Sequence, residues 1–169
     1  MDVDISITSE DWSAYPEVGS LLVRAACTAV EIAGLPAGAG AELSVVLGSD
    51  DFVRQLNRTY RGRDSATNVL SFPQQAPVDG AERALIGDIA LAFETVAREA
   101  AATKKPLQHH AAHLVIHGLL HLFGYDHETD RKATRMEDME RAVLDALGIP
   151  DPYMQDEVQS EPAALGPAS

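Results

Sequence analysis

The chain has 169 residues, a formal net charge of −13 at pH 7 and 46% hydrophobic residues, which suits one domain with a substantial core. No apolar run reaches the roughly 18 residues of a membrane helix, and the acidic start lacks the basic and apolar regions of a signal peptide. A single cysteine is consistent with a reducing compartment, so we expect a cytoplasmic protein without a membrane partner.

Hydrophobic periodicity predicts alternating strands and helices in the first part of the chain. Alternation of apolar and polar residues is typical of half-buried strands, and a stripe at helical spacing is typical of an amphipathic helix. Gly34 and Pro36 end the first helix, and Ser49 is a suitable N-cap for the second. The predicted elements are strands over residues 3–7 and 43–47 and helices over residues 17–33 and 50–60.

The rest of the chain continues with short strands and then with helices. Strands that precede helices favour one α+β domain, over residues 1–153, in which a small mixed sheet is packed with helices. Residues 154–169 contain several acids and two prolines, so we expect a disordered acidic tail. The predicted elements are strands over residues 68–72 and 84–93, a polar loop over 75–82, and helices over 93–102, 106–123 and 130–147.

The predicted second helix carries a local cluster of positive charge on this acidic chain. Arg54, Arg58 and Arg61 recur at helical spacing, which lines them along one face. Such a basic stripe can engage a few phosphates, although the net charge of −13 counts against a general nucleic-acid binder. The charge pattern alone is equally compatible with a solvated helix face. Asp64 and Thr67, which follow the stripe, suit a turn that holds this loop.

All six histidines of the chain lie between His109 and His127, and three of them have metal-ligand spacing. His117 and His121 project from one helix face a turn apart, and Gly124 lets the chain turn back so that His127 approaches them. Three imidazoles with an open fourth position are typical of a catalytic zinc site. The alternative is that these are core or surface histidines of an amphipathic helix.

The histidine spacing also matches the ligands of metzincin proteases, but the general base of those enzymes is missing. They carry a glutamate directly after the first histidine, and this chain has Gly118 there. A glycine inside a helix costs about 1 kcal/mol relative to alanine, so something needs the room. Either another backbone packs closely at Gly118, or substrate approaches the metal from that side.

Two long motifs are similar to the signatures of a known family. His117–His127 reads HGLLHLFGYDH, and residues 57–73 read NRTYRGRDSATNVLSFP. Together with Gly87-Asp88-Ile89 and the ending at residues 147–153, they resemble the YbeY family of metallo-endoribonucleases over residues 3–153. The resemblance implies a zinc-dependent, single-strand-specific endoribonuclease that matures the 3′ end of small-subunit ribosomal RNA and acts in ribosome quality control. The implied partners are single-stranded RNA, ribosomal RNA, and the small ribosomal subunit or its assembly factors.

The resemblance and the residue chemistry together suggest a role for each side chain. We expect one Zn²⁺ per chain on the three motif histidines and a catalytic role for Arg61, whose planar guanidinium suits a phosphate. We expect His109 and His110 to face solvent. Two other functions remain open: a metallohydrolase of a non-nucleic substrate, and a ribosome-assembly factor with a structural metal. Possible substrate-binding or metal-supporting residues are Arg54, Arg58, Asp88, His113 and Asp126.

Overall fold

The computed structural model describes residues 1–73 and 85–153, so the predicted loop over 75–82 and the predicted tail over 154–169 lie outside the described residues. The strands are β1 (Asp2–Ile7), β2 (Glu42–Gly48), β3 (Val69–Pro73) and β4 (Leu85–Ala92). The helices are the short 3-10 helix η1 (Glu10–Ala14), α1 (Val18–Ala33), α2 (Asp50–Arg61), α3 (Phe93–Ala102), α4 (Leu107–Leu122) and α5 (Asp130–Ala146).

These elements confirm the predicted order of strands and helices, with η1 as an unpredicted addition. The local signals act as expected. The Ser49 side chain accepts a hydrogen bond from the Phe52 amide at 3.1 Å, which caps α2, and Gly34 ends α1 in the left-handed conformation with φ 62°. None of the helices in the described ranges is long and apolar enough to cross a membrane.

The sheet is mixed and has the strand order β1-β2-β4-β3. β1, β2 and β4 are parallel, and β3 runs antiparallel to β4 at the edge of the sheet. In this register Ser71 lies opposite Ile89, and Phe72 lies opposite Asp88. Because successive side chains of a strand point to opposite faces, these two pairs face opposite sides of the sheet.

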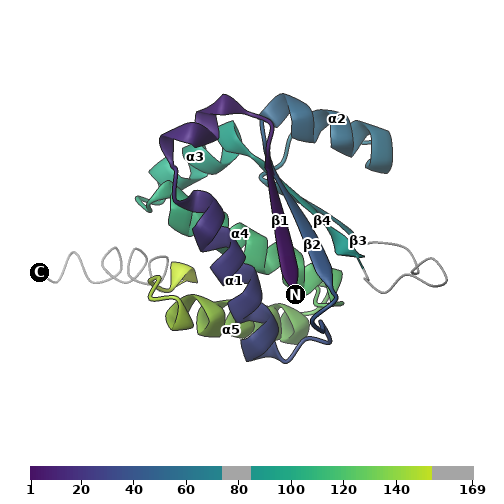
Figure 1. The fold of residues 1–169 in the computed structure, drawn as a ribbon, viewed down its shortest axis with the longest axis vertical. Helices are drawn as coiled ribbons and strands as arrows, with labels where there is room; N and C mark the ends of the chain where they lie inside the picture. The colour runs from purple at the N-terminus through teal and green to yellow at the C-terminus, as the bar shows by residue number, and fades with distance from the viewer. Residues whose placement is uncertain (74–84, 154–169) are drawn as a thin grey trace, which may run out of the picture.

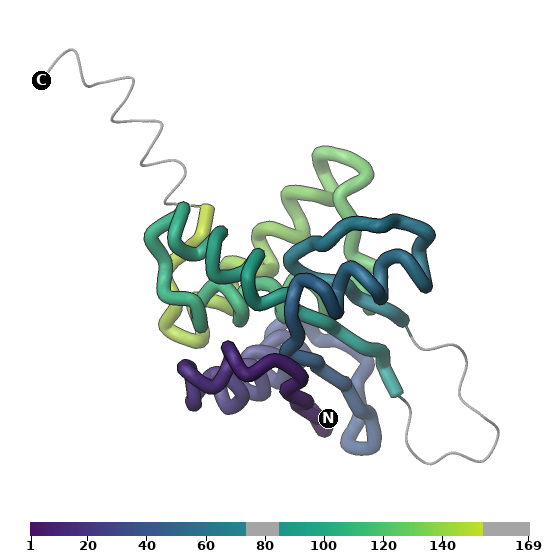
Figure 2. The backbone as a smooth tube through the Cα atoms, turned by 90° about the horizontal axis from the view of Figure 1, so that it is seen from above, coloured from purple at the N-terminus to yellow at the C-terminus, as the bar shows by residue number. Residues whose placement is uncertain are grey.

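Helices cover both faces of the sheet (Figure 1; Figure 2). One face packs against α1, α4 and the other helices around the main core, through side chains such as Val45 in β2 and Ile89 in β4. The opposite face packs a smaller cluster against α2, which includes Val53, Leu70 and Ala90. The fold therefore separates the two predicted functional helices: α4 lies on one side of the sheet and α2 on the other.

α4 approaches β3 and β4 closely at Gly118. A Cβ atom at this position would lie 2.7 Å from Ser71 Oγ and 3.3 Å from Ile89 Cδ1. The hydroxyl of Ser71 also donates a hydrogen bond to the Gly118 carbonyl oxygen at 3.2 Å. Side chains of the sheet, and neither another backbone nor a substrate, therefore use the room at Gly118.

We predict that Gly118→Ala destabilises the protein, because the added methyl group must displace Ser71 or Ile89. Overpacking of this kind destabilises a protein by about 1–3 kcal/mol. In an unobstructed helix, by contrast, alanine stabilises the fold by about 1 kcal/mol relative to glycine. Gly19→Ala in α1 is the matched control, since its Cβ would meet only Ile5 Cγ2 at 4.0 Å. Thermal unfolding should separate the two variants, and a Gly118→Ala variant as stable as the wild type would contradict this packing.

Candidate metal centre

Three histidines converge at the end of α4 and the turn that follows it. His117 and His121 belong to the last turns of α4, and His127 follows Gly124, whose φ of 97° reverses the chain. One nitrogen from each ring lies within 4.8 Å of the other two, and the Nε2 atoms of His117 and His121 are 3.1 Å apart. Two nitrogens bound to one tetrahedral zinc lie about 3.3 Å apart, as Zn–N distances of about 2.0–2.1 Å require. This cluster can hold a metal ion.

The surroundings of His121 favour its neutral imidazole, the form that binds metal. Burial lowers the pKa of His121, and the nearby His117 and His127 lower it further because they disfavour a second positive charge. His117 and His121 also line an open cleft of about 460 Å³ beside β3. A metal held here would therefore face a space that admits a substrate.

Glu140 of α5 is fully buried and supports His117 from behind. The His117 Nδ1–H donates to Glu140 Oε1 at 3.3 Å, and the His113 Nε2–H donates to the same oxygen at 2.6 Å. Burial alone would raise the pKa of Glu140, but the hydrogen bonds from both histidines outweigh it and hold this pKa at about 2. An ionised Glu140 keeps the His117 proton on Nδ1, which leaves Nε2 unprotonated and directed toward His121.

Tyr153 completes the set of donors around Glu140. Its hydroxyl donates to Glu140 Oε2 at 3.3 Å, and its ring meets the His113 ring edge-on at 5.7 Å. Burial, and then the charge of Glu140, raise the pKa of Tyr153. Each oxygen of the buried carboxylate thus has a donor, as a buried charge requires.

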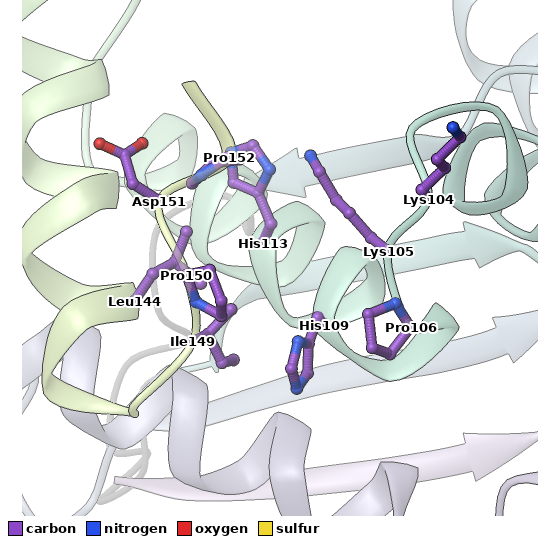
Figure 3. A pocket seen from close by; sticks show the side chains of 10 residues that line it. All are labelled: Lys104, Lys105, Pro106, His109, His113, Leu144, Ile149, Pro150, Asp151 and Pro152. Carbon is purple, nitrogen blue, oxygen red and sulfur yellow. The ribbon is translucent and has the colours of Figure 1, made fainter. Parts of the chain in front are cut away.

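His113 also borders a second cavity, of about 420 Å³, which lies where α4 begins (Figure 3). Lys104, Lys105 and the half-buried His109 line it together with Pro152. His113 is thus a packed, hydrogen-bonded side chain that supports Glu140 and does not belong to the ligand cluster.

Arg61 reaches the metal cleft from the opposite side of the sheet. It ends α2, where Gly62 takes the left-handed conformation, and its Nη2 donates to the Ser71 carbonyl oxygen at 2.7 Å. Its guanidinium carbon lies 5.3 Å from the centre of the Phe72 ring. Arg61 lines the same cleft as His117 and His121, so the structure brings these predicted residues together.

The other arginines of the stripe differ in their surroundings. Arg54 forms a two-point ion pair with Asp64, with N–O distances of 2.7 and 3.0 Å. The hydrogen bond with Arg54 lowers the pKa of Asp64, so the charge of Arg54 is already matched. Arg58 is exposed one turn before Arg61. Of the three arginines of the stripe, all within the described residues, Arg61 is the one that lines the cleft.

Within the described residues, neither Asp88 nor Asp126 forms a hydrogen bond with a histidine of the cluster. Asp88 is on the opposite face of the sheet from α4, in a groove with Tyr60 and Phe72, so it cannot orient a metal histidine. Asp126 caps a turn: its carboxylate accepts from the Glu128 amide at 3.0 Å and pairs with Lys132 at 3.5 Å.

The expectation that His110 faces solvent is wrong. Its side chain is buried, and its Nε2 lies 2.9 Å from Glu99 Oε1. The reason is that α3 packs beside α4 and presents this carboxylate to it. Glu99 also accepts from Asn68 Nδ2 at 2.9 Å, so one carboxylate joins α3, α4 and the segment before β3.

Sequence reasoning missed Glu140, although the chain contains a signal for it. Glu140 follows Met136 by four residues and precedes Val143 by three, and both of these are fully buried. A glutamate on the apolar stripe of a helix is buried only where other side chains pair with its carboxylate. Two histidines at helical spacing on a neighbouring helix are suitable partners.

Comparisons with known proteins agree with this geometry. The family model described as Endoribonuclease YbeY matches residues 6–148. An Endoribonuclease YbeY of Rhodopseudomonas palustris is 50% identical over 153 residues, which cover 89% of this chain and 80% of the relative. An Endoribonuclease YbeY of Azorhizobium caulinodans is 44% identical, with 90% and 96% covered. The solution structure of TM1509 from Thermotoga maritima, 22% identical, has a TM-score of 0.51 over 86% of this chain and 91% of that chain, which shows the fold.

We predict that the wild-type protein binds one metal ion per chain and that His121→Ala loses it, because two imidazoles remain where three are needed. His109→Ala is the control, since this histidine lies outside the cluster. Elemental analysis after extensive dialysis measures both. Undiminished metal in the His121→Ala variant would refute the ligand assignment.

We predict that Glu140→Gln weakens metal binding by roughly 10- to 100-fold, the usual effect of losing the partner of a metal-bound histidine. Glu99→Gln is the matched control, because Glu99 also bonds a histidine of α4, yet that histidine is not in the cluster. Competition with a chelator of known affinity measures the difference. Equal metal affinity of the two variants would show that Glu140 has only a packing role.

Proposed function

Because this chain belongs to the YbeY endoribonuclease family, we propose that it is a zinc-dependent enzyme that cuts single-stranded RNA. Its proposed substrate is ribosomal RNA, including the 3′ end of the small-subunit RNA, and its proposed place of action is the cytoplasm, in ribosome maturation and quality control. The small ribosomal subunit or its assembly factors are the partners that this role implies.

One observation carries the proposal: Arg61, His117 and His121 line a single cleft of about 460 Å³. Cleavage of a phosphodiester is accelerated by a positive charge that stabilises the transition state and by an activated oxygen nucleophile. Arg61 provides the first, and the histidine cluster can hold the ion that provides the second. When bound, zinc supplies Lewis-acid chemistry, in that it activates water at neutral pH and polarises a phosphoryl oxygen.

The protein residues hold this arrangement in place. Ser71 fixes one N–H of Arg61, and the remaining N–H groups of its guanidinium are available to a phosphate and to the charge that develops on it. Glu140 keeps the proton of His117 on Nδ1, away from the cleft. The attacking group is a water or the 2′-hydroxyl of the RNA, and the arrangement serves both.

The position of Gly118 argues against a protease. The general base of a metzincin would start from this residue, but a Cβ atom there would lie 2.7 Å from Ser71 Oγ, so a glutamate would have to displace side chains of the sheet. A metal centre without that carboxylate lacks a proton acceptor for peptide hydrolysis. Phosphodiester cleavage supported by zinc and Arg61 does not require it.

A single strand suits the cleft better than a duplex. The cleft lies between the edge strand β3 and α4. Arg61 lines it on a chain of net charge −13, and the exposed Arg58 lies one turn earlier on α2. Duplex RNA is recognised through extended contacts across a shallow groove, for which this small basic area is insufficient. A flexible strand can bend one phosphate toward the histidines while few contacts hold it.

We predict that Arg61→Ala lowers kcat/KM for single-stranded RNA by roughly 10²- to 10³-fold, the range for the loss of one donor to a transition-state charge. Arg61→Lys should recover little, because an ammonium cannot replace the planar fork. Arg54→Ala removes the same charge from the same helix, but from a side chain already paired with Asp64, and serves as the control.

These variants are assayed on one RNA sequence, alone and annealed to its complement, at two salt concentrations. We expect wild-type cleavage of the single strand only, with strong inhibition by salt. Full activity of Arg61→Ala with its metal retained would remove Arg61 from the mechanism. Equal cleavage of single strand and duplex would contradict the proposed substrate.

A further inference from the structure

A third space, separate from the metal cleft and from the cavity beside His113, lies on the face of the sheet that α2 covers. It has a volume of about 540 Å³, and its walls are mainly apolar and aromatic. The residues that line it come from α2, β2, β3 and β4: Val46, Phe52, Leu56, Tyr60, Phe72, Pro73, Asp88, Ile89 and Ala90. We call this hollow the α2 groove. The proposed chemistry of the metal cleft makes no use of it.

Tyr60 stands at the α2 groove as an exposed aromatic side chain. It is 69% exposed, more than Ile7 at 57% and Ile32 at 45%, the other exposed large hydrophobic side chains of the described residues. Its ring packs beside the Phe72 ring, with centroids 5.5 Å apart and planes tilted by 56°. The contact with Phe72 holds the Tyr60 ring while most of its surface stays in water, where it can receive a flat partner.

The α2 groove adjoins the metal cleft at Pro73. Pro73 lines both spaces, and Phe72 lies directly between Pro73 and Ser71, which lines the cleft. Arg61 lines the cleft while its guanidinium carbon lies 5.3 Å from the Phe72 ring of the groove. A strand whose phosphate contacts Arg61 therefore has an aromatic surface beside it on the same edge of the sheet.

We propose that Tyr60, supported by Phe72, is a stacking platform for an unpaired nucleobase of the RNA strand whose phosphate lies at Arg61. This proposal rests on the proposed function and names the part of the substrate that the α2 groove receives. A base binds an aromatic ring through its flat face whatever its identity. The carboxylate of Asp88 in the groove repels phosphate and accepts N–H groups from base edges, so the base and not the backbone enters.

The platform supplies a physical origin for single-strand selectivity. A base within a duplex is covered on both faces by its neighbours, so it cannot stack on Tyr60 without leaving the helix. An unpaired base has no base pair to break, so stacking on Tyr60 costs it much less free energy. The exposed ring of Tyr60 thus favours the same substrate that the small basic area of Arg58 and Arg61 favours, through a different interaction.

The test compares Tyr60→Ala, which removes the ring, with Tyr60→Phe, which keeps it. Ile32→Ala is the control for loss of an exposed apolar side chain, since Ile32 lies on α1, outside the residues that line the cleft and the groove. We expect Tyr60→Ala to raise KM for single-stranded RNA by roughly 5- to 100-fold with kcat nearly unchanged, and Tyr60→Phe and Ile32→Ala to match the wild type.

A second readout does not depend on cleavage. A short single-stranded RNA that contains 2-aminopurine is added to chelator-treated protein, and stacking on Tyr60 should quench its fluorescence in the wild type and Tyr60→Phe but not in Tyr60→Ala. Unchanged KM and quenching in Tyr60→Ala, with RNA still cut, would overturn the platform and leave the proposed function standing. RNA that is neither bound nor cut by the wild type would overturn both.

Discussion

The contact between α4 and β3 at Gly118 is the constraint on which the site depends. Because residue 118 has no side chain, Ser71 can approach the helix and donate to the Gly118 carbonyl oxygen. The Ser71 carbonyl oxygen in turn accepts from Arg61, which arrives from the other side of the sheet. One strand residue thus sets the distance between the metal helix and the arginine. A bulkier residue at position 118 would separate the two halves of the cleft.

The buried carboxylate of Glu140 in α5 supports the metal ligand His117 from the side away from the cleft. Glu140 is buried, yet it remains ionised because His113, His117 and Tyr153 all donate to it. A buried carboxylate depends on its donors, so the loss of one of the three weakens the support of the buried charge. The hydrogen bonds that keep the buried Glu140 stable therefore also orient the metal ligand His117.

The sequence predicts those features that depend on neighbours along the chain. Helical spacing identifies His117 and His121, the turn at Gly124 places His127, and Ser49 marks the start of α2, because each signal lies within a few residues. The motifs also indicate the family. Features that depend on distant segments were out of reach. The pairing register decides that Asp88 faces α2, and the packing of α3 and α5 on α4 decides that His110 meets Glu99 and His113 meets Glu140.

The central claim is that a metal held by the three histidines cuts RNA, and one measurement tests it most directly. Single-stranded RNA is incubated with the chelator-treated protein, with its metal content determined, and with the same protein after zinc is restored. Circular dichroism monitors the fold in each state. We expect cleavage to disappear with the metal and return with zinc, while the secondary structure persists in both states because the hydrophobic core is built from other side chains than the three histidines. Undiminished cleavage by folded, metal-free protein would contradict the account.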